Sequence, residues 1–228
     1  MTMRIATWNM QGGSLLDDDV KRTLLMDMFK RGIDVVCLQE MTEPLPSFRF
    51  QGVGTDGVRV HTMDPPVSNR RKREPLYTCY YFEWSHGGNK RCSLAIYAMS
   101  SVAAFGAESD ISLSNRPMLW VRIGNTFIGN VHLPSGYPPT AEASFAHFKS
   151  VMNGIPAGHR YVIAGDFNMP FNYIEKRFLD ENNFHNPQVA THQGGNTLDY
   201  VYFQGDVGDI RYTPGYYSDH RAFECMIL

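Results

Sequence analysis

The sequence has no run that approaches the ~18 consecutive apolar residues of a membrane-spanning helix. Its first residues lead straight into a strand-like pattern, without the apolar segment of a secretory signal peptide. We therefore expect no membrane span. Localisation stays open between a secreted or delivered effector that acts in a target cell and a cytoplasmic protein.

Cysteine is also scarce. The four cysteines show no Cys-x-x-Cys or Cys/His ligand spacing, which argues against a zinc site, and they are too few to staple a chain of 228 residues. Cys37 and Cys225 lie in apolar runs and are expected in the core. Cys79 and Cys92 could face each other across a hairpin that turns at residues 85–89, and the sequence leaves open whether they are bonded.

Charged residues make up only 19% of the chain, and 21 Lys and Arg stand against 23 Asp and Glu, a net charge of −2. A disordered chain or a coiled coil would carry more charge. The slightly acidic balance excludes a globally basic nucleic-acid coat but leaves room for a local basic patch.

Hydrophobic residues make up 43% of the 228 residues, enough for one domain, residues 1–228, with a sizeable core. Many strand patterns with a few helices between them predict an α/β domain in which helices cover two packed sheets. The strand patterns lie at residues 4–8, 33–38, 79–84, 92–99, 117–123, 126–133, 161–164, 197–203 and 221–227.

The helical patterns are fewer. The first opens at residues 17–19, ends at Gly32 and should place Val20, Leu24, Leu25 and Met28 on its buried face. The second is marked by Ala141, Phe145, Phe148 and Met152, and a shorter one covers about 173–179. Residues 42–76 are rich in Pro, Gly and charge and are expected to form a long surface excursion.

Polar side chains interrupt or follow several of these apolar strands. Taken singly, each has an ordinary structural explanation, such as a turn former, a hydrogen-bonded core histidine or an acid bonded to backbone. Together they are harder to dismiss, because a buried charge without a partner costs several kcal/mol and ligand sites assemble where strands end. The residues concerned are Asn9, Glu40, His132, Asp166, Asn168, Asp199, Asp219 and His220.

Their chemistry is consistent with a phosphate-handling metal site. Glu40, Asp219 and Asn9 offer hard oxygens suited to Mg²⁺. A histidine held by a carboxylate can act as an acid, a base or a charge stabiliser near neutral pH.

Local geometry constrains how these residues meet. On extended backbone the side chains of Asp166 and Asn168, two residues apart, would face the same way. Asp219 and His220 can share a site only if they lie on a turn, which residues 215–218 provide.

The ordered motifs resemble the endonuclease/exonuclease/phosphatase superfamily, typified by deoxyribonuclease I, over residues 4–226. Within it the chain looks most similar to the catalytic B subunits of cytolethal distending toxins. The motifs are Thr-Trp-Asn-Met-Gln-Gly at 7–12, Leu-Gln-Glu at 38–40, Gly-Asn-Lys-Arg-Cys-Ser at 88–93, Ser-Asn-Arg-Pro at 114–117, Val-His at 131–132, Gly-Asp-Phe-Asn at 165–168, Gly-Gly-Asn-Thr-Leu-Asp-Tyr at 194–200 and Ser-Asp-His at 218–220.

The resemblance implies a deoxyribonuclease I-like, four-layer α/β/β/α sandwich of two mixed sheets and Mg²⁺-dependent cleavage of DNA, with Mn²⁺ or Ca²⁺ as alternative ions. It also implies a toxin-type, DNA-damaging nuclease: a monomeric catalytic unit that binds DNA, with delivery or binding subunits as further partners.

The resemblance also implies roles for single residues. Glu40 would be the principal metal carboxylate, supported by Asn9 and Asp219. Asp166 and Asn168 would position the attacking water and the scissile phosphate. His132 and His220 would flank the phosphate, and Asp199 would orient His220. Arg91 and Arg116 would contact phosphate, because a guanidinium binds phosphate oxygens bidentately.

The chain departs from its relatives at two points. Deoxyribonuclease I has a glutamate near the position of Arg91, paired with the histidine that matches His132, and here that position is basic. Residues 133–136, Leu-Pro-Ser-Gly, are not the usual toxin continuation.

Other functions of the same fold remain as alternatives. The first is a phosphatase acting on phosphoinositides or other phosphomonoesters; such enzymes typically carry Trp-Cys-Asp-Arg where this chain has residues 196–200. An abasic-site endonuclease usually places a lysine soon after the glutamate, whereas Met41-Thr42 follows here. A binding module without activity would be expected to lack a ligand, and none is missing.

The densest charge run is at residues 69–74. It is either a solvated loop, a nuclear-import signal or a contact to the DNA backbone. We favour the DNA contact, because a protein that is acidic overall must hold a polyanion through a local patch. Its basic residues are Arg70, Arg71, Lys72 and Arg73.

Overall fold

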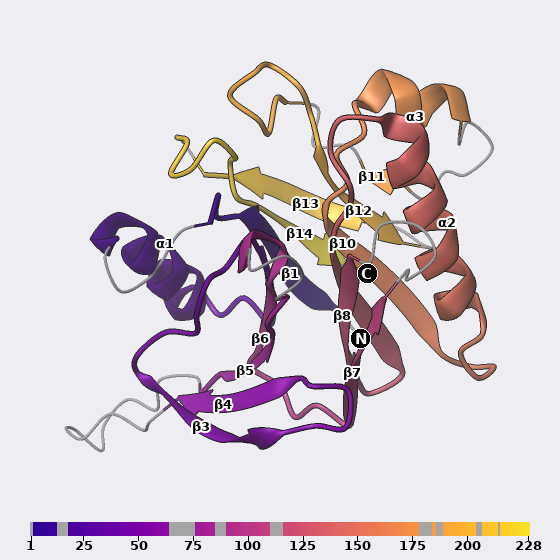
Figure 1. Cartoon of the computed structure of the whole chain (residues 1–228). Helices are drawn as coiled ribbons and strands as arrows, with labels where there is room; N and C mark the ends of the chain where they lie inside the picture. The colour runs from indigo at the N-terminus through magenta and orange to yellow at the C-terminus, as the bar shows by residue number, and fades with distance from the viewer. Residues whose placement is uncertain are drawn as a thin grey trace.

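Two β-sheets pack face to face at the centre of the molecule, with α1 on one side and α2 and α3 on the other (Figure 1). This arrangement confirms the predicted α/β/β/α sandwich. The computed structural model describes residues 2–12, 18–63, 76–84, 90–109, 116–177, 184–185, 189–203, 207–213 and 215–228, without the side chains of 175–177.

The larger sheet has eight strands within the described residues and is mixed, because β1 and β2 run parallel while its other pairs are antiparallel. Its spatial order is β13-β14-β1-β2-β6-β5-β4-β3. The strands are β1 (Met3–Asn9), β2 (Val35–Gln39), β3 (Phe48–Val53), β4 (Arg59–Met63), β5 (Thr78–Phe82), β6 (Leu94–Ala98), β13 (Val207–Tyr212) and β14 (Phe223–Ile227).

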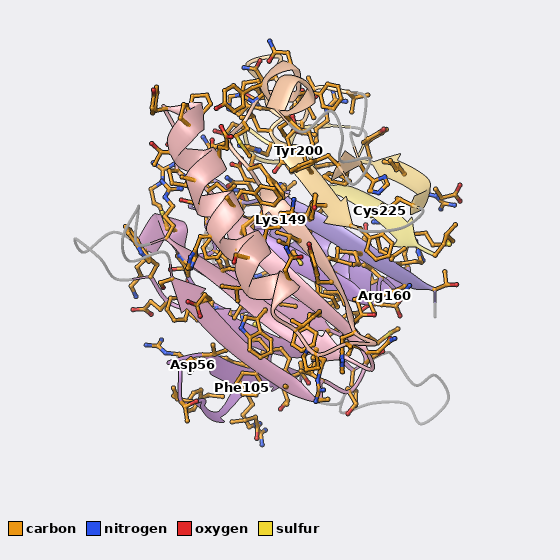
Figure 2. The ribbon with its side chains drawn as sticks, turned by 90° about the vertical axis from the view of Figure 1, so that its right-hand side faces the viewer. Asp56, Phe105, Lys149, Arg160, Tyr200 and Cys225 are labelled. Carbon is orange, nitrogen blue, oxygen red and sulfur yellow. The ribbon has the colours of Figure 1, made fainter. Side chains whose placement is uncertain are left out.

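The smaller sheet has six strands within the described ranges, in the order β11-β12-β10-β9-β8-β7, and its parallel pair is β9 and β10. Figure 2 shows α2 lying across the outer face of this sheet. The strands are β7 (Ala104–Ser109), β8 (Pro117–Ile123), β9 (Thr126–His132), β10 (Arg160–Asp166), β11 (Phe184–His185) and β12 (Asp199–Phe203).

The core between the sheets is built from alternate residues of the central strands. Ile5 and Cys37 of the larger sheet and Val121 and Val162 of the smaller one are fully or almost fully buried in the same cluster. Every second side chain of a strand faces the same way, so the residues between them face the helices instead.

Helix α1 (Asp19–Lys30) covers the outer face of the larger sheet. Asp18 caps it by accepting hydrogen bonds from two backbone N–H groups, and Gly32, with φ of +68°, ends it in the left-handed conformation that suits glycine. Leu25 and Met28 are buried as expected, but Val20 is 56% exposed, so the predicted apolar face was wrong at its first position. Val20 faces solvent, and Phe29 completes the buried stripe instead.

Helix α2 (Pro138–Asn153) and the short helix α3 (Phe171–Arg177) lie on the other side of the sandwich. All four residues that marked α2 in the sequence are buried against the smaller sheet. Proline at the first helical positions favours the start of α2, where its missing N–H has no helical partner to lose.

The predicted surface excursion at residues 42–76 was wrong where β3 and β4 form, and residues 64–75 lie outside the described residues. The remaining part contains β3 and β4, which pair with each other and extend the larger sheet through β5. They were missed because the edge strand β3 is largely exposed, Phe50 included at 54%, and β4 beside it is only partly buried, so both lack the apolar alternation of a buried strand. The strands β7, β11 and β13 were also not predicted.

The four cysteines are free and buried, so Cys79 and Cys92 are not bonded. Cys37 and Cys225 lie in the core between the sheets, as expected. Among the described helices, none combines the length and the apolar character needed to cross a membrane.

Candidate active site

The polar residues predicted to form a site meet at one edge of both sheets. Asn9 ends β1, and Glu40 follows β2, its parallel neighbour. In the other sheet His132 ends β9 and pairs in register with Asp166, the last residue of β10. Because parallel strands end at the same edge, the sheet topology brings these side chains together.

These side chains line a polar pocket of about 310 Å³. Among the described residues predicted for the site, all except Asp199 contribute to the lining, and Asp199 lies behind His220. The lining residues are Asn9, Glu40, Arg91, Cys92, Arg116, His132, Ser135, Asp166, Asn168, His192, Leu198, Asp219 and His220.

The backbone is unusual where the strands enter the pocket. Glu40 and Asn168 have φ of +53° and +49°, a left-handed conformation that residues other than glycine rarely adopt. Gly165, with φ of +146°, allows close approach of β10 to β9, because a Cβ there would lie 2.0 Å from the carbonyl oxygen of Val131.

The expectation that Asp166 and Asn168 sit on extended backbone was wrong. The chain turns at Asn168, whose backbone N–H donates to Asp166 Oδ1 at 2.9 Å. The Asn168 side chain donates to the carbonyl of Leu133 at 2.8 Å. Both side chains still line the pocket, but a local turn rather than strand alternation places them there.

Asn9 links two of the carboxylates. Its Oδ1 accepts from the backbone N–H of Gln11 at 2.9 Å, so its Nδ2 is turned to the acids. That nitrogen donates to Asp166 Oδ2 at 2.9 Å and lies 3.5 Å from Glu40 Oε1. The side chain of Asn9 therefore fixes the spacing between an acid of each sheet.

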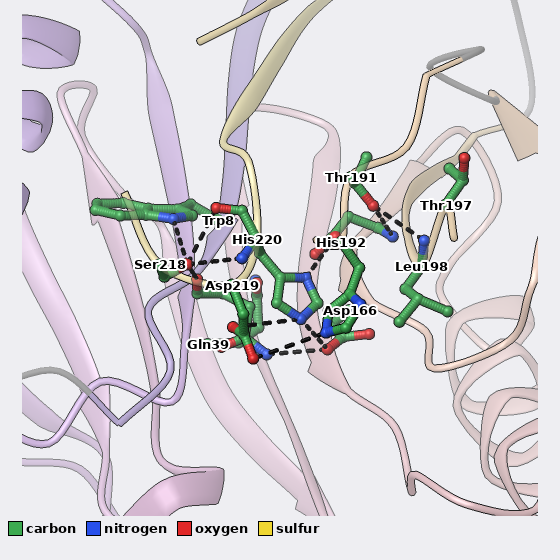
Figure 3. Close-up of polar contacts among 12 residues, drawn as sticks. Trp8, Gln39, Asp166, Thr191, His192, Thr197, Leu198, Ser218, Asp219 and His220 are labelled. Carbon is green, nitrogen blue, oxygen red and sulfur yellow. Dashed lines mark hydrogen bonds and ion pairs between the residues drawn. The ribbon is translucent and has the colours of Figure 1, made fainter. Parts of the chain in front are cut away.

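His220 is held by Asp199, as the resemblance implied. Its Nδ1 lies 2.7 Å from Asp199 Oδ2, and its Nε2 lies 3.6 Å from Asp166 Oδ2 and 3.9 Å from Asp219 Oδ1 (Figure 3). Burial lowers the pKa of His220, but the charges of the three aspartates outweigh it and raise that pKa to about 9. Burial and the charge of Asp199 raise the pKa of Asp166 to about 7.

His132 lies in the opposite electrostatic environment. Its Nε2 is 3.7 Å from Glu40 Oε1 and 3.8 Å from Asp166 Oδ2. Burial, then the charges of Arg116, His220 and Arg91, hold the pKa of His132 well below its usual range. The two pKa shifts run in opposite directions and favour a neutral His132 and a charged His220, a separation typical of paired acid and base groups.

The turn predicted to bring Asp219 and His220 into the site is present. Ser218 Oγ donates to the carbonyl of Asn9 at 2.6 Å and accepts from Trp8 Nε1 at 3.2 Å, which ties the turn to the end of β1. The backbone N–H of Asp219 donates to Gln11 Oε1 at 3.1 Å.

The model of the endonuclease/exonuclease/phosphatase family matches residues 6–220 of the sequence. The chain belongs to the endonuclease/exonuclease/phosphatase family. Its fold is deoxyribonuclease I-like, and its reaction class is hydrolysis of phosphoesters. The family is generally dependent on divalent metal ions.

The chain is also similar to cytolethal distending toxins. The B subunit of the cytolethal distending toxin of Escherichia coli is 22% identical over 210 residues, which are 87% of this chain and 77% of that protein. The solved toxin of Actinobacillus actinomycetemcomitans has a TM-score of 0.80 at 22% identity and covers 97% of both chains. The Haemophilus ducreyi toxin has a TM-score of 0.81 at 22% identity, over 98% of this chain and 97% of that one. The expected resemblance is therefore confirmed.

The donor set of the pocket fits a divalent cation. The carboxylates of Glu40 and Asp219 supply hard oxygen donors on one polar surface, and the Asn9 amide presents its nitrogen to the neighbouring acids. Two groups of donor atoms are already close enough to share an ion: Asp166 with Asp199 and His220, and His192 with Asp219 and His220. Glu40 belongs to neither group, and its Oε2 accepts from Arg91 Nε at 3.1 Å.

The two expected phosphate-binding arginines differ in how firmly their side chains are held. Arg116 Nη1 donates to the backbone carbonyls of His132 and Leu133 at 3.3 and 3.0 Å, which anchors it at the C-terminal end of β9. Arg91 lies in the short 3₁₀ turn Lys90–Cys92, and its side chain is 58% exposed. Both line the pocket.

Sequence reasoning missed His192, which lines the pocket 3.7 Å from Asp219 Oδ2. It precedes a Gly-Gly turn rather than ending an apolar strand, so the pattern that found the other residues could not find it. The basic run containing Arg70, Arg71, Lys72 and Arg73 lies outside the described residues.

Proposed function

We propose that the chain is a divalent-metal-dependent endonuclease that hydrolyses the phosphodiester backbone of DNA. One observation carries the proposal. Two histidines, His132 at the end of β9 and His220 on the turn before β14, lie 3.8 and 3.6 Å from the same oxygen of Asp166, in a pocket that also holds two arginines. Acid–base groups beside phosphate-binding arginines suit cleavage of a phosphoester.

The metal ligands in this proposal are the carboxylates of Glu40 and Asp219, and Asn9 supports the site by donating to Asp166 beside Glu40. Mg²⁺ is the ion we favour, because it takes few protein ligands, keeps several waters and bridges to phosphate; Mn²⁺ and Ca²⁺ are the alternatives. When bound, the cation supplies charge neutralisation and polarisation at the phosphoryl group. Arg91 donates to the same Glu40 carboxylate, so its charge would lie beside the bound cation.

The remaining residues of the pocket bind and orient the substrate and move protons. Asp166 orients the attacking water through Oδ2, which Asn9 Nδ2 holds in place, and Asn168 lies beside it on the same turn. His220, fixed by Asp199, presents its Nε2 to the reacting group, and His132 faces it from β9. Arg116 and Arg91 would hold the phosphate oxygens.

A phosphomonoesterase is the second candidate. The pocket favours it in one respect, since Arg91 and Arg116 together could neutralise the two charges of a terminal phosphate. Residues 196–200, Asn-Thr-Leu-Asp-Tyr, lack the block typical of inositol phosphatases, which supports the nuclease.

Similarity to a protein described as a toxin subunit supports a toxin-type, DNA-damaging nuclease. In this proposal the chain is a monomeric catalytic unit, delivered to a target cell by binding subunits.

Two assays run side by side test the proposal. We expect the purified chain to nick supercoiled plasmid with Mg²⁺ and to stop when EDTA is added, with little phosphate released from phosphoinositide vesicles. His132→Ala should remove the nicking, which controls for a contaminating nuclease. Phosphate release without nicking would reverse the order of the two candidates.

A further inference from the structure

A short segment beside the active site, Thr191–Asn196, holds the turn that carries Asp219 and His220. The backbone N–H of Gln193 donates to the carbonyl of Asp219 at 2.8 Å. His192 and His220 form an isolated β-bridge, and their rings meet edge to face with centroids 4.9 Å apart. Figure 3 shows His192 beside His220, with Thr191 turned to Leu198 on the other side.

The same segment also supports Asp199. Thr191 Oγ1 accepts from the backbone N–H of Asp199 at 3.1 Å, and the carbonyl of Thr191 accepts from the N–H of Arg221 at 2.7 Å. One stretch of chain therefore contacts the backbone around Asp199, Asp219 and His220.

The hydrogen bonds of His192 determine which ring nitrogen carries its proton. The backbone N–H of Gly194 donates to Nδ1 of His192 at 2.9 Å. A ring nitrogen that accepts a hydrogen bond has no hydrogen of its own, so the neutral imidazole carries its proton on Nε2. That Nε2 lies 3.7 Å from Asp219 Oδ2.

The turn is shaped to hold the ring in this orientation. A Cβ on Gly194 would lie 2.9 Å from His192 Nδ1, and Gly195 has φ of +86°. Both positions therefore favour glycine. The N–H of Gly194 bonds to a side chain two residues earlier, the geometry that an asparagine would form in an Asx turn.

We propose that His192 is a positioning residue that acts through Asp219, a role that rests on the proposed function. Its Nε2–H faces Asp219 Oδ2 at 3.7 Å, so that it would hold this oxygen and leave Oδ1, 3.9 Å from His220 Nε2, directed at the reacting groups. The present distance of 3.7 Å reaches hydrogen-bond length with a shift of about half an ångström, as catalytic contacts do when a site is loaded.

The same atoms could instead make His192 a direct metal ligand, since His192, Asp219 and His220 lie close enough to share an ion. The bond from Gly194 argues against this, because the proton on Nε2 occupies the lone pair that a metal would need.

Two isosteric variants separate the roles. In His192→Asn, Oδ1 can replace Nδ1 as the acceptor for Gly194, but the side chain is too short to reach Asp219. In His192→Gln, Nε2 can replace the ring donor to Asp219, but the acceptor for Gly194 is lost. We measure Mn²⁺ affinity by calorimetry without DNA, the melting temperature, and plasmid nicking.

We expect His192→Asn to melt near wild type but to bind Mn²⁺ about 10- to 100-fold more weakly, the usual effect of losing a group that orients a metal ligand. His192→Gln should restore affinity and nicking to within about threefold of wild type, whatever its melting temperature. If His192→Asn kept wild-type Mn²⁺ affinity and nicking while His192→Gln lost them, His192 would be needed only to form the turn, and the proposal would be overturned.

Equal loss of Mn²⁺ affinity in both variants would make His192 a direct ligand and would also overturn it. If wild type nicks plasmid and both variants match it in nicking and Mn²⁺ affinity, the proposed function stands and only the positioning role of His192 is overturned. A wild-type chain that binds no Mn²⁺ and nicks no DNA overturns both proposals.

Discussion

Arg91 donates from Nε to Glu40 Oε2 across 3.1 Å, so the carboxylate proposed to hold the metal already has a guanidinium beside it. The arginine side chain is 58% exposed and that of Glu40 only 12%. A cation bound by Glu40 would share this carboxylate with Arg91, and their like charges would repel each other.

We predict that Arg91→Ala lowers the Mg²⁺ concentration at half-maximal nicking by up to about fivefold, because exposed ion pairs are worth at most about 1 kcal/mol. The same variant should raise KM for DNA, since it removes a phosphate contact. Lys90→Ala is the matched control, because the neighbouring Lys90 pairs with Glu83 at 3.4 Å instead. A higher Mg²⁺ requirement in Arg91→Ala would assign Arg91 to metal retention.

The two histidines should each be needed for turnover. We predict that His132→Ala and His220→Ala lose about 10²- to 10⁴-fold in kcat, the usual contribution of a positioned acid or base. His147, which lies on α2 near Glu108, provides the control substitution to alanine. Turnover within about threefold of wild type in either active-site variant would remove that histidine from the mechanism.

Asp199→Asn should reproduce most of the His220 loss. An amide cannot hold the imidazolium as the carboxylate does, so the pKa of His220 should fall from about 9 toward its ordinary value in the metal-free protein. NMR titration of the imidazole measures this fall directly, with the exposed Asp209→Asn as the control. Full activity of Asp199→Asn from about pH 6 to 9 would break the proposed pairing.

The sequence predicted the strand ends that form the site better than it predicted the edges of the fold. Asn9, His132 and Asp166 stood out because polar residues in apolar strands need a partner. Residues of β3 and β4 carried no such signal, since an exposed edge strand and its partly buried neighbour can use almost any side chain. His192 was missed because its neighbours in space, Asp219 and His220, come from a turn that only the folded chain brings to it.

The basic run remains a prediction from sequence alone. If Arg70, Arg71, Lys72 and Arg73 neutralise two or three phosphates, replacing all four by Ser should reduce the slope of log K against log salt by about 2 to 3 for duplex DNA. Cleavage of a small chromogenic phosphodiester should not change, because that substrate has no flanking backbone. An unaltered salt dependence would leave the run a solvated loop.

The most direct test of the metal-dependent nuclease is the Mg²⁺ dependence of plasmid nicking by wild type and Glu40→Gln. The substitution keeps the shape of the side chain but removes the charge that would hold the cation. We predict that wild type nicks DNA at limiting Mg²⁺ while Glu40→Gln is inactive there and recovers, at most in part, at high Mg²⁺. Wild-type turnover by Glu40→Gln at limiting Mg²⁺ would contradict the assignment of Glu40 and the account built on it.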